Sequence, residues 1–358
     1  RSDDLGSLWS TLNLDFQSNL GTMRVAPRLK KNTNTTDQAN LGEPVAFKYF
    51  GVFHVIAGGR IFVGGTSAND VFTPDTATNS QTSYSALSDL QIFNGILFST
   101  TNTEIWSLDG AGGTWTRRGG AAPLGSSSHM MAYFKKFNRL YVIGDVTKIY
   151  SLDTAYSLAT TGDYSLNLNS PNQQEVSICM KDTSDSIWIG AGNYLNETGR
   201  GKIYQWDGIS AQVTNEYILD ANACMAILIH NDIPYAFDSN GALSKFNGFS
   251  FEEIGRLPNN NLVNVNYVVN TSFIHPNGLL ATKNNTILAL VRNRNNDSTS
   301  SIPENLPSGV WEWSSDFGFT HKHSISYNPV ASSTITDYGQ NRVALTGALA
   351  NGDALSSP

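Results

Sequence analysis

The 358-residue sequence has few charged residues, only two cysteines and no long hydrophobic run. Asp, Glu, Lys and Arg make up 15% of the chain, against roughly 25% in an ordinary soluble domain, and the formal net charge is −7. Because the chain is acidic and has no run of Lys or Arg, we expect no nucleic-acid partner. No segment approaches the ~18 consecutive apolar residues of a membrane-spanning helix, so no membrane insertion is expected. Two cysteines cannot form a disulfide framework.

Several catalytic signatures are absent from the sequence as well. It has no nucleophile elbow, no phosphate-binding loop and no HExxH motif. His321 and His323 have the spacing of one strand face, but no third metal ligand lies near them in the sequence. We therefore predict no metal, no cofactor and no enzymatic activity. Since the chain starts at Arg1 and not at Met, we expect a processed protein or part of a longer one.

What the sequence does contain is an internal repeat. A short apolar strand, a tight polar turn and a second apolar strand recur seven times, and hydrophobic residues make up 40% of the chain. The second strands are expected to begin at residues 61, 96, 140, 187, 233, 287 and 343. Intervals of 35 to 56 residues are typical of the four-stranded blades of a β-propeller.

A second unit follows the first six copies. It is an amphipathic segment that in most copies ends in Asp or Asn, as in Ile105–Asp109, Ile203–Asp207 and Leu243–Asn247. Alternation with a period of two predicts a half-buried strand, and the Asp-Gly or Asn-Gly pairs predict a hairpin turn to a fourth strand. The aromatic residues of these third strands are expected to pack mostly between blades: Trp106, Tyr150, Tyr204, Trp206, Trp311 and Trp313.

The seventh copy of this second unit is missing at the C-terminal end, and residues 7–27 contain two segments that could replace it. We predict an all-β fold with a single domain over residues 1–358, a seven-bladed β-propeller of four-stranded antiparallel blades. The closing blade would take its inner strands from residues 332–349 and its outer strands from residues 7–27. Such a ring has no free sheet edge. A six-bladed ring with irregular flanking strands is the alternative.

One segment matches a known repeat signature. Ser314–Thr320 is a nearly complete Asp box, and the blade pattern resembles Kelch-type and Asp-box β-propellers. This resemblance implies a turn-forming device that carries no chemistry. More weakly, the few charges, the abundant Asn, Ser, Thr and Gly, and the stretch Leu20–Leu29 resemble propeller-like structural proteins of tailed-bacteriophage particles. That resemblance implies a virion or extracellular localisation.

The connections between strands differ in length on the two faces of such a propeller. Turns within the inner and outer strand pairs lie on one face and are short here, whereas nearly all long connections lie on the other. Function is usually carried by long loops on a rigid scaffold, so we predict that the loop-rich face binds a partner. Amide and guanidinium groups suit hydroxyls and carboxylates, and tyrosine stacks on sugar rings. The candidate binding residues are Asn193, Tyr194, Asn196, Arg200, Arg292, Asn293, Arg294 and Asn295. The alternative is that these Asn-rich loops are only soluble turns.

Cys179 and Cys224 occupy matching places in the first strands of adjacent blades. First strands crowd the central channel, which favours small apolar side chains. We predict that both are buried packing thiols, neither catalytic nor joined as a disulfide.

These observations predict a non-enzymatic structural and interaction module, a phage tail or capsid-associated component. Its loop-rich face would meet other structural subunits or a host-surface glycan. The alternative is a carbohydrate-active hydrolase, sialidase-like or another glycosidase, at the channel mouth. Such an enzyme needs two neighbouring carboxyl groups, for which Asp220 and Glu304 are candidates. A cellular Kelch-like adaptor is a third interpretation.

Overall fold

The computed structural model shows an all-β chain. It describes residues 14–15, 24–25, 45–49, 52–57, 60–63, 73–74, 90–100, 104–109, 115–119, 130–145, 148–158, 176–193, 200–257, 272–273, 278–293, 309–324, 334–339 and 342–346. In this part of the chain one short 3-10 turn, η1 (Lys135–Phe137), interrupts the strands, and no helix could span a membrane.

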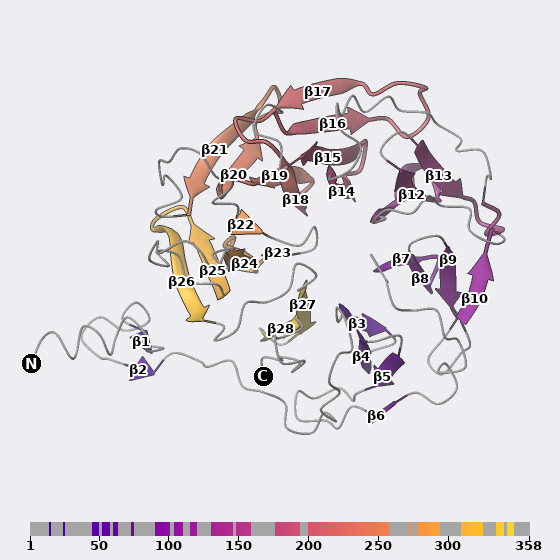
Figure 1. The fold of residues 1–358 in the computed structure, drawn as a ribbon, viewed down its shortest axis with the longest axis horizontal. Coiled ribbons are helices and arrows are strands. Elements are labelled where there is room, and N and C mark those ends of the chain that lie inside the picture. Colours follow the sequence, from indigo (N-terminus) through magenta and orange to yellow (C-terminus); the bar gives the residue numbers. More distant parts are fainter. Residues whose placement is uncertain are drawn as a thin grey trace, which may run out of the picture.

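The strands form antiparallel sheets that follow one another around a ring in chain order (Figure 1). The first two of these sheets hold β3 (Val45–Tyr49), β4 (Val52–Ala57), β5 (Arg60–Val63) and β6 (Thr73–Pro74), then β7 (Leu90–Phe93), β8 (Ile96–Thr100), β9 (Ile105–Leu108) and β10 (Trp115–Arg118). The next two hold β11 (Met130–Phe134), β12 (Arg139–Asp145) and β13 (Lys148–Leu152), then β14 (Val176–Asp182), β15 (Ile187–Asn193), β16 (Lys202–Trp206) and β17 (Asn215–Ile218).

The remaining sheets complete the ring in Figure 1. They hold β18 (Cys224–His230), β19 (Ile233–Asp238), β20 (Ala242–Phe246) and β21 (Phe251–Arg256), then β22 (Ser272–Phe273), β23 (Leu279–Ala281), β24 (Ile287–Asn293), β25 (Gly309–Ser314) and β26 (Gly318–Ser324), and lastly β27 (Thr334–Gly339) and β28 (Arg342–Thr346). A separate pair, β1 (Leu14–Asp15) and β2 (Arg24–Val25), lies outside the ring.

The fold is a β-propeller of antiparallel, mostly four-stranded blades, as the repeat predicts. In each complete blade, consecutive strands are hydrogen-bonded neighbours, as in the order β14-β15-β16-β17. The first strands of successive blades contact one another: β7 meets β11, β11 meets β14, β14 meets β18 and β18 meets β23. Strand β27 lies against both β23 and β3, which are far apart in the sequence.

The predicted hairpins match the strands in all copies but the first. The sequence predicts that the hairpin around Gly58-Gly59 contains the first two strands of its blade. The structure places β3 before it, so this hairpin joins the second and third strands, β4 and β5. The prediction was wrong because β3 itself pairs with β4, with Tyr49 opposite Val52, and the repeat pattern did not reveal this earlier strand.

The proposed closing blade is only partly described. Strands β27 and β28 pair with each other within the predicted range 332–349, and β1 and β2 pair within residues 7–27. In the described part of the chain, neither β1 nor β2 pairs with β28. The completion of this blade by both ends of the chain, and with it the single closed domain, stays a prediction.

The hydrophobic core lies between successive blades, where five of the six predicted aromatic residues are found, all except Trp106. Of the six, five are buried and Trp313 is half-buried. Tyr141 and Trp206 contact edge to face with ring centroids 5.2 Å apart, and the Tyr141 hydroxyl donates to the backbone carbonyl of Gly208 at 2.6 Å. These contacts join the blade β11–β13 to the blade β14–β17. Stacked blades thereby hide apolar surface that no single sheet could bury.

The two cysteines are buried free thiols, as predicted. They lie nearer to each other than adjacent first strands were expected to bring them, with the sulfur atoms 3.8 Å apart. The close approach depends on Gly190, where an added Cβ would lie 2.5 Å from both sulfur atoms. The hydrogen bond between the Cys224 and Cys179 thiols and the burial of both raise the pKa of Cys224, which favours its protonated form.

Candidate interaction surfaces

The predicted binding residues lie at or beyond the ends of second strands. Asn193 ends β15, and Arg292 and Asn293 end β24. The loops that the sequence predicted there therefore begin a few residues later than expected. These strands are longer because Asn193 pairs with Val176, and Ser272 and Phe273 of β22 pair with Asn293 and Arg292. The structure brings both groups to the same face of the propeller, on blades separated by β18–β21. Tyr194, Asn196, Arg294 and Asn295 lie outside the described residues.

Arg200 is the predicted site residue whose side chain is described. It is exposed, and its Nη1 atom lies 3.8 Å from Oδ1 of Asp220, which leads into the next blade. Arg256, on that next blade, forms a closer ion pair with Glu253 at 2.5 Å, which raises the pKa of the guanidinium. Where these two blades meet on the loop-rich face, guanidinium and carboxylate groups are therefore exposed to solvent.

Asp238 is a buried carboxyl group on the same face that sequence reasoning missed. It ends β19 and accepts the backbone N–H groups of Asn240 and Ala242 at 2.8 and 2.9 Å, which holds the three-residue connection to β20. Burial raises its pKa to about 6, although these hydrogen bonds and Arg256 act in the opposite direction. The sequence Asp-Ser-Asn-Gly is a turn signal that could have located it.

Asp182 is a second carboxyl group whose pKa burial raises to about 6. It ends β14, a first strand, whereas Asp238 ends β19, a second strand. Since antiparallel neighbours run in opposite directions, the two groups lie on opposite faces of the propeller and do not form a pair. The glycosidase candidate Asp220 is exposed and paired with Arg200, and Glu304 lies outside the described residues.

The opposite surface, which we call the turn face, carries the short turns. Polar contacts link the inner turns of four successive blades. Lys136 lies 3.8 Å from Asp185, Ser184 binds Asp232, and His230 lies within hydrogen-bond distance of Asn285 at 3.1 Å. These contacts fix neighbouring turns relative to one another.

The outer turns of the turn face present apolar side chains to solvent. In the blades β14–β17 and β18–β21 the side chain of an Asp or Asn accepts two backbone N–H groups: Asp207 from Ile209 and Ser210, and Asn247 from Phe249 and Ser250. This Asx turn lifts the third residue out of the turn. Ile209 is 55% exposed and Phe249 is 89% exposed. In the Asp box, Ser314 accepts the N–H of Phe317, which is 65% exposed.

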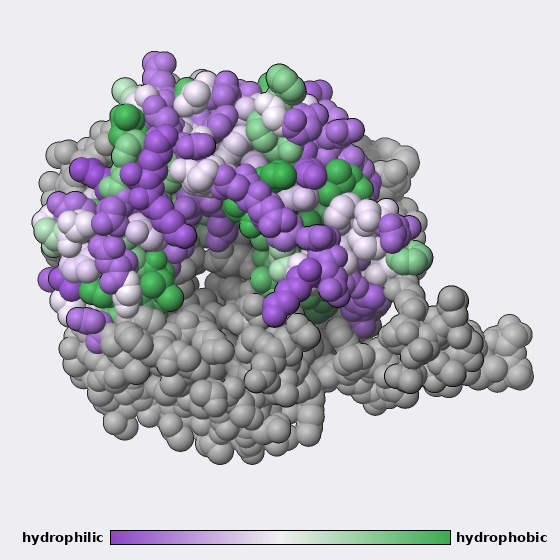
Figure 2. Space-filling model, turned by 180° about the vertical axis from the view of Figure 1, so that it is seen from behind, coloured by the Kyte–Doolittle hydropathy of each residue, from purple (hydrophilic) through white to green (hydrophobic). Residues whose placement is uncertain are grey.

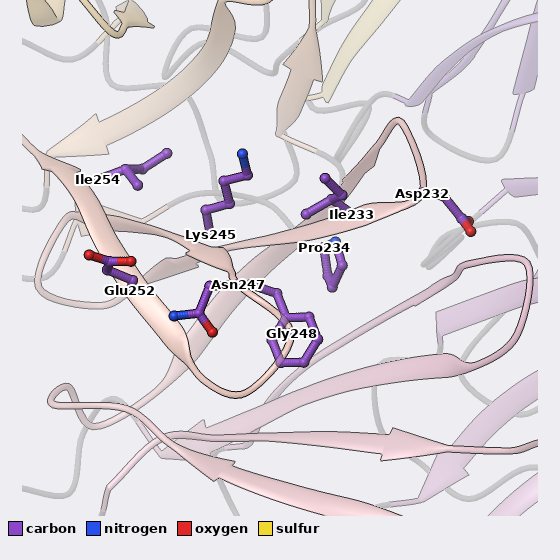
Figure 3. A pocket seen from close by; sticks show the side chains of 9 residues that line it. Asp232, Ile233, Pro234, Lys245, Asn247, Gly248, Glu252 and Ile254 are labelled. Carbon is purple, nitrogen blue, oxygen red and sulfur yellow. The ribbon is translucent and has the colours of Figure 1, made fainter.

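A pocket of about 530 Å³ opens beside the Phe249 turn. Ile233, Pro234 and Ile254 supply apolar walls, and Lys245 and Glu252 supply opposite charges (Figure 3). Asp232, Asn247 and Gly248 also line it. Around the ring, hydrophilic residues cover most of the described surface seen in Figure 2, with separate hydrophobic patches among them. No cluster of His, Cys, Asp or Glu in the described part could hold a metal ion.

No protein-family model matches the sequence, and no curated protein matches it. Solved structures do match its fold. The extracellular domain of BT4673 from B. thetaiotaomicron gives a TM-score of 0.57 at 11% identity, over 93% of this chain and 40% of that one. U3-55K gives a TM-score of 0.57 at 9% identity, over 93% and 100% of the two chains. The Dos1 propeller gives a TM-score of 0.52 at 11% identity, over 92% and 81%.

These likenesses confirm the β-propeller fold and, at such low identity, nothing more specific. The chain spans about 40% of the length of the BT4673 domain that it matches. The resemblance to Kelch-type and phage propellers stays a prediction.

Proposed function

We propose that this chain is a non-enzymatic structural and interaction module whose loop-rich face contacts a protein neighbour or a surface glycan. The observation that carries the proposal is the unequal length of the connections on the two faces. On the turn face, β18–β19 are joined by two residues, β25–β26 by three and β14–β15 by four. Eight residues separate β16 from β17 on that face, whereas 15 residues separate β24 from β25 on the opposite face, and 23 residues lie between β13 and β14, which begins there.

The contacts between inner turns favour a supporting role for the turn face and a binding role for the loop-rich face. A scaffold that positions long loops must hold its blades in fixed relation, and the contacts between inner turns do so on the turn face. The exposed guanidinium of Arg200 and the exposed carboxylate of Asp220 lie at the start of the loop-rich face, where a partner can exchange one charged contact for another.

The arrangement of carboxyl groups favours a binding module over a glycosidase. Hydrolysis of a glycosidic bond requires two carboxyl groups roughly 5–10 Å apart. The two described carboxyl groups with a pKa of about 6, Asp182 and Asp238, belong to opposite faces and do not form such a pair.

We further propose that the protein is a component of a virus particle, a phage tail or capsid-associated protein, outside the host cell. The low charge and the abundance of Asn, Ser, Thr and Gly support this assignment. The extracellular domain of BT4673 has the same fold, which is compatible with an extracellular location.

Cross-linking of the native assembly followed by mass spectrometry tests the proposal. Lys202, at the start of β16, reports on the loop-rich face, whereas Lys136, in η1, reports on the turn face. We expect cross-links from Lys202 to other subunits of the assembly or, for a glycan ligand, binding on a glycan array that Arg200→Glu weakens. Ile92→Asp, at an exposed site away from that face, is the matched control. Turnover of glycoside substrates by the purified chain would overturn the proposal in favour of a hydrolase. Hetero-protein cross-links confined to Lys136, with no glycan bound, would also overturn it.

A further inference from the structure

The turn between β20 and β21 is built as a rigid apolar projection. The Asn247 side chain accepts the N–H groups of Phe249 and Ser250 at 3.0 and 2.9 Å, and the Asn247 N–H donates to the Ser250 carbonyl at 3.1 Å. Gly248 adopts a φ of +100°, which other residues rarely tolerate. The Phe249 ring is thus held in solvent by a preorganised turn, an arrangement that costs little further entropy on binding.

The pocket lies directly beside this projection on the same face. Its apolar lining residues Ile233 and Ile254 belong to β19 and β21, and Gly248 comes from the Phe249 turn itself. At about 530 Å³ the pocket is large enough to admit an aromatic side chain. Figure 3 shows Lys245 between Ile254 and Ile233, with Glu252 on the neighbouring strand.

Lys245 and Glu252 are directly opposite each other in the β20–β21 register. The ammonium group of Lys245 contacts the Tyr235 ring, 5.8 Å from its centroid, and no ion pair among the described residues includes Lys245 or Glu252. One positive and one negative group therefore stand side by side at the pocket, each available to an opposite charge.

We propose that this surface binds a second copy of the same chain in a two-fold symmetric contact. An isologous interface requires a patch that complements itself. This patch does so in two ways: Phe249 projects beside a pocket that can receive an aromatic ring, and adjacent opposite charges pair with their counterparts when the patch is turned onto itself. Ile209 and Phe317, in the outer turns of the flanking blades, are exposed on the same face.

The inference deepens the proposed function, because it names one of the protein neighbours and gives the turn face a role distinct from that of the loop-rich face. Sedimentation velocity of the full chain over a range of concentrations tests it. We expect a monomer–dimer equilibrium. Phe249→Asp should raise its dissociation constant about tenfold or more, as is typical when a central aromatic contact is lost. Ile218→Asp is the matched control, since Ile218 is 59% exposed and ends β17 on the loop-rich side.

Charge exchange makes the test independent of the folding of the Phe249 variant. Lys245→Glu and Glu252→Lys should each weaken self-association, the two variants mixed together should associate, and the double variant K245E/E252K should recover the dimer. A wild-type chain that stays monomeric, a double variant that does not recover, or an equal loss in Ile218→Asp would overturn the inference. None of these results bears on the Lys202 cross-links or glycan binding, which decide the proposed function separately.

Discussion

Ser184 donates two hydrogen bonds to Asp232 across the boundary between two blades. Its backbone N–H lies 2.7 Å from Oδ1, and its hydroxyl binds Oδ2. Both bonds lower the pKa of Asp232, the side-chain bond most of all. The turn between β14 and β15 is thereby tied to the turn between β18 and β19.

Removing this tie with Asp232→Ala should lower the free energy of unfolding by less than about 1 kcal/mol, because the pair is exposed to solvent. The folded-state pKa lies below the unfolded value of about 3.9, so the stabilisation is present above pH ~4 and is lost as the pH falls through the folded-state pKa. Urea unfolding at neutral and acidic pH measures this effect. Ser184→Ala should cost a similar amount, and strictly additive effects in the double variant would contradict the tie.

The contribution of Asp238 to the free energy of unfolding should depend on pH in the opposite direction to that of Asp232, and Asp238→Asn tests this. Asparagine can still accept the N–H groups of Asn240 and Ala242, but it carries no buried charge. The folded state binds the Asp238 proton more tightly than the unfolded state, so wild-type stability falls as the pH rises from about 4 to about 6. A pKa raised from 3.8 to about 6 corresponds to at most about 3 kcal/mol.

The free energy of unfolding of Asp238→Asn, relative to wild type, should therefore rise between pH 4 and pH 7 and then level off. Chemical denaturation at several pH values measures the difference. Asp220→Asn, which removes an exposed carboxylate, is the matched control. A constant difference between Asp238→Asn and wild type across this range would show that the carboxyl group titrates normally.

The repeat made the fold predictable, because each blade hides its apolar faces against its neighbours and so repeats the same pattern of strands. It predicted the Asp and Asn turns and the buried third-strand aromatics correctly. It failed at β3, because Phe50-Gly51, between β3 and β4, lacks the Asn or Asp that marks the hairpins of most other copies. It could not show that Phe249 lies beside a pocket, since residues of β19, β20 and β21 meet there only in the folded sheet.

Nor could the pattern reveal that Cys179 and Cys224 lie close together, because this depends on residue 190 being a glycine, which has no side chain. Gly190→Ala should lower the free energy of unfolding by about 1–3 kcal/mol, the usual cost of overpacking a core. Its Cβ would lie 2.5 Å from both sulfur atoms and 2.9 Å from the Cys224 Cβ. In a Cys179→Ala, Cys224→Ala background the same substitution should cost less, since only the Cβ contact remains. An equal cost in both backgrounds, measured by urea unfolding, would rule out the sulfur contacts as its cause.

The hydrogen bond from Tyr141 to Gly208 also joins two blades, and its removal separates the polar contribution from the packing. Tyr141→Phe keeps the ring against Trp206 and leaves the buried Gly208 carbonyl without this donor, so we expect a loss of about 1–3 kcal/mol. Tyr133→Phe is the matched control, because the Tyr133 hydroxyl donates at 2.8 Å to Asn138 in an exposed turn where water can replace it. Equilibrium unfolding of both variants gives the comparison. If Tyr133→Phe cost as much as Tyr141→Phe, burial at the boundary between the blades would not be what gives the Tyr141 bond its value.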